Sequence, residues 1–220
     1  MNEAYRNLAR IEDSSANERR AVFLRPLALG AAGTYSLALA IMLTIAPGQP
    51  PYIYFIVISW LLLYGAIYAL SQRGHVTVAS HLFCYAFNLG LFLIFMANVA
   101  QLSHESPSAV EGGLGSANVM AMTMSLSVLF AGLLISSGAS FWFAAANTAL
   151  VVAPYLIFIP SAADATVTSF PIIAFFWLMA LVSWLYQRSL GTVRARLNAA
   201  RQEVMKSELL RRDLTIAREL

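Results

Sequence analysis

The sequence has no charged residue in any of its six long apolar runs, and this absence excludes several classes of membrane protein. The runs are 27–46, 52–70, 76–100, 119–135, 139–159 and 170–186. Ion-coupled transporters generally carry ionisable groups inside the membrane. A retinal protein needs a membrane-embedded lysine for its Schiff base, and the one lysine of this chain, Lys206, follows the last run. A small-molecule transporter is therefore the least favoured of the functions that the sequence leaves open.

Cysteine and histidine are too few and too scattered for a metal or haem centre within one chain. Cys84 is the only cysteine, so no intrachain disulfide can form. His81 and His104 are 23 residues apart, which is ~35 Å along a helix, so they cannot share an ion, and His75 and His81 point to different faces. Only a symmetric pair across a dimer could ligate a metal. We expect no cofactor, and no hydrolase motif indicates that these residues form an enzyme.

Basic residues are absent from every second connection between the apolar runs. Of the fourteen Lys and Arg residues, five precede the first run, Arg73 lies between the second and third, and eight follow the last. The alternate connections contain Glu105, Glu111 and Asp164 but no basic residue. Positive charge is retained in the cytoplasm. Both termini are therefore expected in the cytoplasm, which requires an even number of spans.

Composition and run length together predict the fold class. The chain is 59% hydrophobic and 11% charged, against roughly 25% charged in an average soluble domain, and each run approaches the ~20 residues that a span requires. We predict an all-α integral membrane protein, a six-helix transmembrane bundle with a cytoplasmic coiled-coil exit helix. Its predicted parts are an amphipathic segment over 1–26, the bundle over 27–188 and a signalling helix over 189–220.

The N-terminal segment is expected to lie on the membrane surface. Ser15 and Glu18 fit a capping box, which predicts a break between two short helices. Arg19, Arg20 and Arg25 then meet anionic lipid headgroups, so we expect membrane lipids and no nucleic acid as partners of the basic flank.

Aromatic residues gather near the ends of the runs and are expected to form interfacial belts. They are Tyr52, Tyr54, Tyr68, Trp142, Tyr155, Phe170, Trp184 and Tyr186. An outer loop is expected over 160–169, between the fifth and sixth runs.

Polar residues recur every three or four positions in the third run and form one stripe on a helix. Since polar groups are costly in hydrocarbon, we expect this stripe to face the bundle interior, with Asn147, Ser125 and Ser127 as partners. Hydrogen bonds between helices, at roughly 0.6 kcal/mol per pair, are one interpretation. The other is a ligand-binding niche, whose candidate residues are Thr77, His81, Cys84, Tyr85, Asn88 and Asn147.

The sixth run continues into a polar helical pattern, with apolar positions stepping alternately by three and four as in a two-stranded coiled coil. A step change after Ser207 shifts the seam, as in a stammer. The predicted dimer seam is Leu190, Val193, Leu197, Ala200, Val204, Leu210 and Leu214. The alternative is a single charged amphipathic helix on the membrane surface.

Six short-looped spans followed at once by a charged coiled coil resemble the membrane input modules of bacterial signalling proteins. In that group the exit helix leads into a histidine kinase, a nucleotide or diguanylate cyclase, or a SpoIIE-like phosphatase. The run Asp-Leu-Thr-Ile-Ala-Arg-Glu over 213–219 is similar to the segment that precedes such phosphatases. The resemblance implies a longer protein in the bacterial inner membrane, and it supplies no site residue.

The sequence therefore predicts a homodimeric membrane receptor or sensory input domain. A small or lipophilic ligand, or a change in membrane state, would alter helix packing, and the sixth span would pass that change to the coiled coil. The main alternative is a passive dimerising membrane anchor.

Overall fold

The computed structural model describes residues 2–45, 50–102, 118–158 and 162–219, and every regular element in these ranges is a helix. The helices are α1 (Asn2–Thr44), α2 (Pro51–Gln72), α3 (Val76–Leu102), α5 (Ser125–Leu134), α6 (Ser137–Phe158) and α7 (Ala162–Glu219). A short helical stretch over 118–123 leads into α5 through a turn at Met124.

The described residues of the six predicted apolar runs lie almost entirely in helices, with turns only at Ile45, Met124 and Ile135. Five helical segments of the described chain are long and apolar enough to cross a membrane, and Asn118–Leu134 is a shorter apolar helix. Helices suit this role because they satisfy their backbone hydrogen bonds internally where no water can do so. The architecture is that of a helical membrane bundle.

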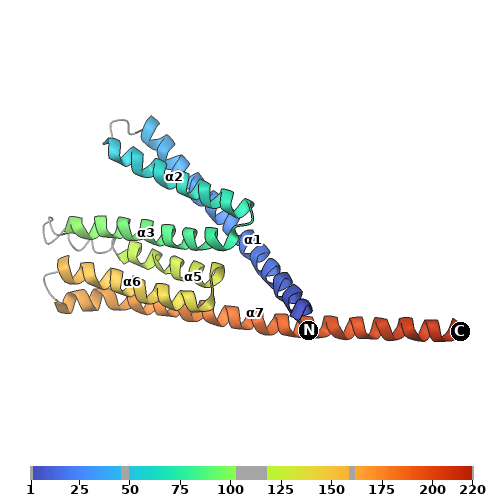
Figure 1. The fold of residues 1–220 in the computed structure, drawn as a ribbon. Helices are drawn as coiled ribbons and strands as arrows, with labels where there is room; N and C mark the ends of the chain where they lie inside the picture. The colour runs from blue at the N-terminus through green and yellow to red at the C-terminus, as the bar shows by residue number, and fades with distance from the viewer. Residues whose placement is uncertain (1, 46–49, 103–117, 159–161, 220) are drawn as a thin grey trace.

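The helices form two groups that meet at one end (Figure 1). α3, α5, α6 and α7 pack side by side, whereas α1 and α2 form a hairpin that diverges from them. The two groups meet near the α2–α3 turn and the α5–α6 turn, an end that we call the turn end. From the turn end α7 continues alone, well beyond the bundle (Figure 1).

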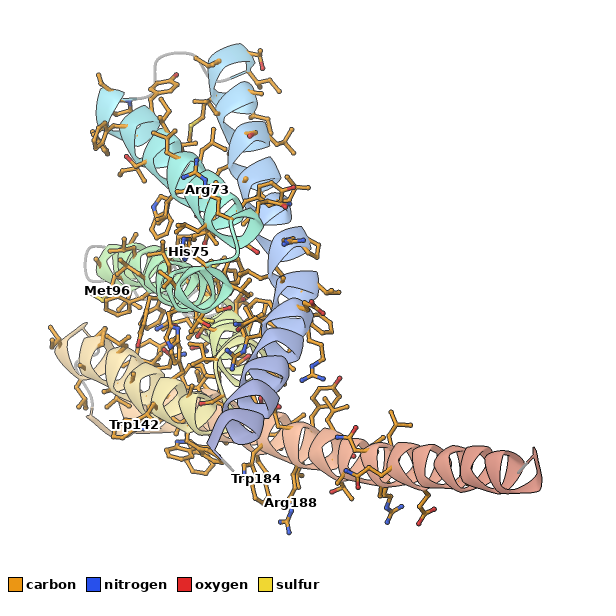
Figure 2. All side chains as sticks on the ribbon, turned by 45° about the vertical axis from the view of Figure 1, so that its right-hand side comes forward. Arg73, His75, Met96, Trp142, Trp184 and Arg188 are labelled. Atoms are coloured by element: carbon orange, nitrogen blue, oxygen red, sulfur yellow. The ribbon has the colours of Figure 1, made fainter. Side chains whose placement is uncertain are left out.

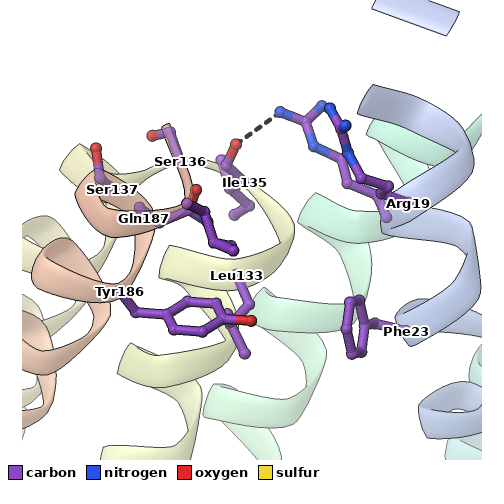
Figure 3. A pocket seen from close by; sticks show the side chains of 10 residues that line it. Arg19, Phe23, Leu133, Ile135, Ser136, Ser137, Tyr186 and Gln187 are labelled. Atoms are coloured by element: carbon purple, nitrogen blue, oxygen red, sulfur yellow. Dashed lines mark hydrogen bonds between the residues drawn. The ribbon is translucent and has the colours of Figure 1, made fainter. Parts of the chain in front are cut away.

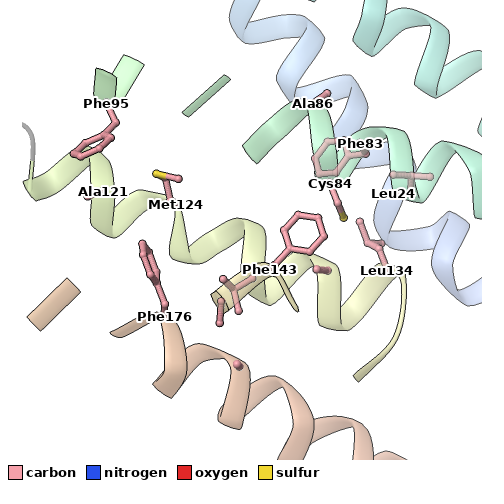
Figure 4. Packing of buried hydrophobic residues seen from close by; sticks show 14 of the residues in the cluster. Leu24, Phe83, Cys84, Ala86, Phe95, Ala121, Met124, Leu134, Phe143 and Phe176 are labelled. Carbon is pink, nitrogen blue, oxygen red and sulfur yellow. The ribbon is translucent and has the colours of Figure 1, made fainter. Parts of the chain in front are cut away.

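The buried core runs between the helices of the larger group and reaches α1 at the turn end (Figure 4). Phe95 and Phe176 lie at one end of it, and Leu24, Phe83 and Leu134 at the other. All five side chains are at most 1% exposed. Leu24, together with Ala21 and Ala28, brings the diverging α1 into the main core.

A chain of aromatic rings links the hairpin to the larger group. Tyr35 of α1 stacks on Trp60 and Tyr64 of α2, and Tyr64 meets Phe83 of α3 edge-on at a centroid distance of 5.8 Å. Phe83 then meets Phe130 of α5, also edge-on, at 5.8 Å. Such pairs stabilise a contact beyond the area that they bury.

Two predicted interruptions are absent. α1 is one helix from Asn2 to Thr44, so the break predicted at Ser15 is wrong. α7 begins at Ala162, so most of the predicted outer loop over 160–169 is helical. At Ser15 the capping-box pattern does not end the helix, and over 162–169 the residues expected to form a loop are helical instead.

The aromatic belt interpretation is wrong for one residue. Tyr155 is 0% exposed, meets Phe95 edge-on and donates a hydrogen bond from its hydroxyl to Asn118 Oδ1 at 2.6 Å. It is a core residue that ties α6 to the start of the 118–134 segment. Trp142, by contrast, is 79% exposed, and Figure 2 shows it at the outside of the bundle.

Candidate functional site

A buried polar cluster joins α3, α5 and α6. The Ser127 hydroxyl lies 2.7 Å from Asn88 Oδ1 and 2.7 Å from the Met124 carbonyl oxygen, and its single proton can serve one of them at a time. Asn147 Nδ2 donates to Ser127 Oγ at 3.0 Å and to the Met124 carbonyl at 3.1 Å. Ser127 and Asn147 were predicted as partners of the polar stripe. Ser127 contacts Asn88 directly, and Asn147 reaches Asn88 through Ser127.

The turn at Met124 places a buried backbone carbonyl at the cluster, and this carbonyl requires hydrogen-bond donors. Met124 interrupts the helix, and its carbonyl accepts a short-range bond from the Ser127 amide at 3.0 Å. That carbonyl is buried in apolar surroundings, where polar groups are stable only when they are hydrogen-bonded. Asn147, at 0% exposure, supplies the additional donor.

The contacts of Asn147 leave one buried acceptor without a partner. Because the Met124 carbonyl can only accept, the amide nitrogen of Asn147 must face it, and the amide oxygen faces the other way. This oxygen, Asn147 Oδ1, has no hydrogen-bond partner within the described part of the chain. An unsatisfied buried acceptor costs about 1–3 kcal/mol, so the position favours an added hydrogen-bond donor.

The other stripe residues of α3 do not join this cluster by any hydrogen bond that the structure shows. Thr77 is exposed and donates to Asn17 Oδ1 of α1 at 3.3 Å, and His81 Nδ1 lies 2.8 Å from the carbonyl of Thr77. Cys84 is fully buried in the apolar core, whereas Tyr85 is 61% exposed and stacks on Phe143. The stripe is therefore divided between the bundle interior and its surface.

A cavity of about 330 Å³ lies at the turn end, where α1, the α5–α6 turn and α7 meet. Its lining comes from three separate parts of the chain: Arg19, Arg20, Phe23, Leu133, Ile135, Ser136, Ser137, Tyr186, Gln187 and Leu190. Arg20 Nη2 donates to the Ile135 carbonyl at 2.9 Å (Figure 3). The sequence alone does not predict this cavity, and its only local signals are the Arg19–Arg20 pair and the serines at 136 and 137.

The contact between α5 and α7 is closest beside this cavity. A Cβ added to Gly132 would collide with Ser183 Oγ and would lie 2.8 Å from Ser183 Cβ. One turn later Gln187 Nε2 donates to the Gly132 carbonyl at 2.8 Å. These contacts fix α7 against α5 at the level where it leaves the bundle.

The predicted dimer seam lies on the part of α7 beyond the bundle. Val193 and Leu197 are 59% and 52% exposed, Ala200 is exposed and Leu190 is partly buried. The side chains of Val204, Leu210 and Leu214 lie outside the described residues. The helix itself is continuous through all seven positions, Gly191 included.

No protein-family model, no curated protein and no solved structure matches this chain. Within the described ranges no three His, Cys, Asp or Glu side chains group closely enough to hold a metal ion.

Proposed function

We propose that the chain is a membrane receptor or sensory input module of a bacterial signalling protein, which works as a homodimer in the inner membrane. Both termini lie in the cytoplasm, and the 118–134 segment is the fourth of six spans. A signal received by the bundle changes the position of α7, which passes the change to a C-terminal output domain. The module itself is not an enzyme.

One observation carries this proposal: α7 is a single helix of 58 residues that belongs both to the bundle and to the segment beyond it. A movement of its first half must therefore move its second half. Val193 and Leu197 expose apolar side chains on the emerging segment, and a second copy of α7 would cover them in a parallel coiled coil.

The buried polar cluster is the place where a small polar signal would act. Asn147 Oδ1 offers an unpaired acceptor to a donor group, and its neighbours Ser127 and Met124 belong to the segment that packs on α7. A ligand shifts an equilibrium only by its difference in affinity for the two states. A bound donor that satisfies this oxygen in one packing arrangement would supply such a difference.

Cysteine crosslinking along α7 tests the dimer. Leu197→Cys is expected to form a disulfide between two copies in native membranes, because Leu197 lies on the predicted seam. Asn198→Cys is the matched control, since it is the next residue on the same exposed helix and lies on a different face. Equal crosslinking at both positions would argue against a defined seam and would favour a single surface helix.

A further inference from the structure

We infer that the cavity at the turn end binds a phosphate group, carried either by an anionic lipid or by a soluble phosphate compound. Neither the buried polar cluster nor the coiled coil is needed for this inference, so it goes beyond the proposed function. It starts from the residues that line the cavity.

Positive charge and hydrogen-bond donors converge at the opening. Arg19 and Arg20 contribute two guanidinium groups, and none of the ten lining residues is acidic. Arg20 uses one N–H to bind the Ile135 carbonyl, which leaves further donors, because a guanidinium has five. Arg19 is exposed, and Figure 3 shows it across the opening from Ser136 and Ser137.

The serine turn adds donors of a second kind. Ser136 Oγ accepts a hydrogen bond from the Ala139 amide at 3.2 Å and so caps the start of α6. The first amides of α6, at Ser137 and Gly138, precede the first full helical turn, and amides at this position suit an anion. Ser137 also lines the cavity with its hydroxyl. Arginines, hydroxyls and helix-start amides together form a typical phosphate-binding set.

The rest of the wall is apolar. Phe23, Leu133 and Leu190 contribute hydrocarbon, and Tyr186 contributes its ring. Figure 3 shows Phe23 and Tyr186 facing each other from opposite sides of the cavity. A phosphate attached to a hydrophobic body therefore fits better than a small free ion. The cavity lies at the ends of apolar helices, where the headgroups of phospholipids are found, so a phospholipid is one such ligand.

An occupant of this cavity would touch α1, the α5–α6 turn and α7 at once. It would hold α1 against α7 beside the Gln187–Gly132 hydrogen bond, where α7 leaves the bundle. Lipid composition, or a soluble phosphate compound, would thereby control how α7 is oriented.

The test compares charge removal inside and outside the cavity. The purified full-length chain in neutral detergent is titrated with short-chain phosphatidic acid, with phosphatidylcholine and with inorganic phosphate, and native mass spectrometry counts the bound molecules. Arg19→Gln is the main variant, because Arg19 is exposed and its loss leaves the Arg20–Ile135 contact in place. Arg73→Gln is the matched control, an equal charge change on an exposed arginine outside the cavity.

We expect the wild-type chain and Arg73→Gln to bind phosphatidic acid alike, and Arg19→Gln to bind it about tenfold more weakly, as the loss of one charged hydrogen bond implies. Arg19→Lys should recover part of the affinity. Binding of inorganic phosphate with the same dependence on Arg19 would identify a soluble source instead. Equal loss in Arg19→Gln and Arg73→Gln would show general attraction to anions and would overturn the inference, as would no effect of any variant. Thermal unfolding of each variant confirms that it is folded.

Discussion

The α1–α2 hairpin and the α5–α6–α7 group both consist of packed apolar helices, but different kinds of contact join the helices in each. In the most apolar eighteen-residue stretch of α1 only 6% of residues are buried, against 39% in α6. The group is joined by Gly132 and by the Asn147 cluster, whereas α1 and α2 of the hairpin are joined by stacked aromatic rings. Close backbone approach and hydrogen bonds bring helices together where the hydrophobic effect gives no preference for protein over lipid.

The difference indicates that the two regions respond differently to change. The α5–α6–α7 group behaves as one tightly fitted body that fixes the start of the emerging helix. The hairpin meets the other helices near the turn end, through the edge-on contact of Tyr64 with Phe83 and through Arg20, which donates to the Ile135 carbonyl. Arg25 donates to the Ser71 carbonyl and so joins α1 to α2 within the hairpin. A signal that moves the hairpin would therefore act on the group through the turn end.

The largest expected effect lies in the tight contact at Gly132. Gly132→Ala should lower the free energy of unfolding by about 1–3 kcal/mol, because its Cβ forces Ser183 and α7 away from α5. Gly65→Ala is the control, since no atom lies within 4 Å of the position of its Cβ, and it should be neutral or slightly stabilising. Unfolding in detergent, followed by circular dichroism, measures both. A loss of similar size at Gly65 would contradict the contrast between the two regions.

A smaller effect is expected where the hairpin meets α3. Tyr64→Leu removes the edge-on ring contact with Phe83, the one of its ring contacts that joins the hairpin to α3, and such a contact is worth about 0.5–1.5 kcal/mol. Because the ring contacts of Tyr64 are to α1, α2 and α3, the loss should appear as faster amide hydrogen exchange in α1 and α2, with little change in α6. Tyr52→Leu, at a site that is 63% exposed, should leave the exchange unchanged. Equal acceleration in α6 would mean that the two regions unfold as one.

The smallest effect is expected in the polar cluster. Asn147→Leu removes two hydrogen bonds to the α5 segment, each worth about 0.6 kcal/mol, so the gross loss is about 1.2 kcal/mol. The unpaired Asn147 Oδ1 disappears in the same variant, which offsets part of the loss. Asn98→Leu, at a half-buried position on α3 whose side chain bonds the Ile94 carbonyl of its own helix, is the comparison and should cost less. Unfolding by increasing amounts of a denaturing detergent measures the free energy of unfolding of both variants. A larger loss for Asn147→Leu than for Gly132→Ala would reverse the order of the two contacts.

The sequence predicted the parts of the fold that polarity controls. Absence of charge marked the six apolar runs that the helices contain, and the cost of polar groups in hydrocarbon pointed to Asn88, Ser127 and Asn147 as partners. Tyr64 and Tyr155 could not be recognised as core residues, because lipid and protein interior are both apolar and leave no periodic signal between helix faces. The Arg19–Arg20 cavity was missed for another reason, since its residues come from three segments that only the fold brings together.

The central claim is that the bundle sets the orientation of α7 beyond the membrane. Alanine insertions after Gly191 test it in a chimera that carries a dimer-dependent reporter after Leu220. One inserted residue turns the following seam by about 100° relative to the bundle, whereas seven restore its face to within about 20°. We predict that reporter output changes with the single insertion and returns with seven. Output that is the same for every insertion length would contradict the account and would identify the bundle as a passive anchor.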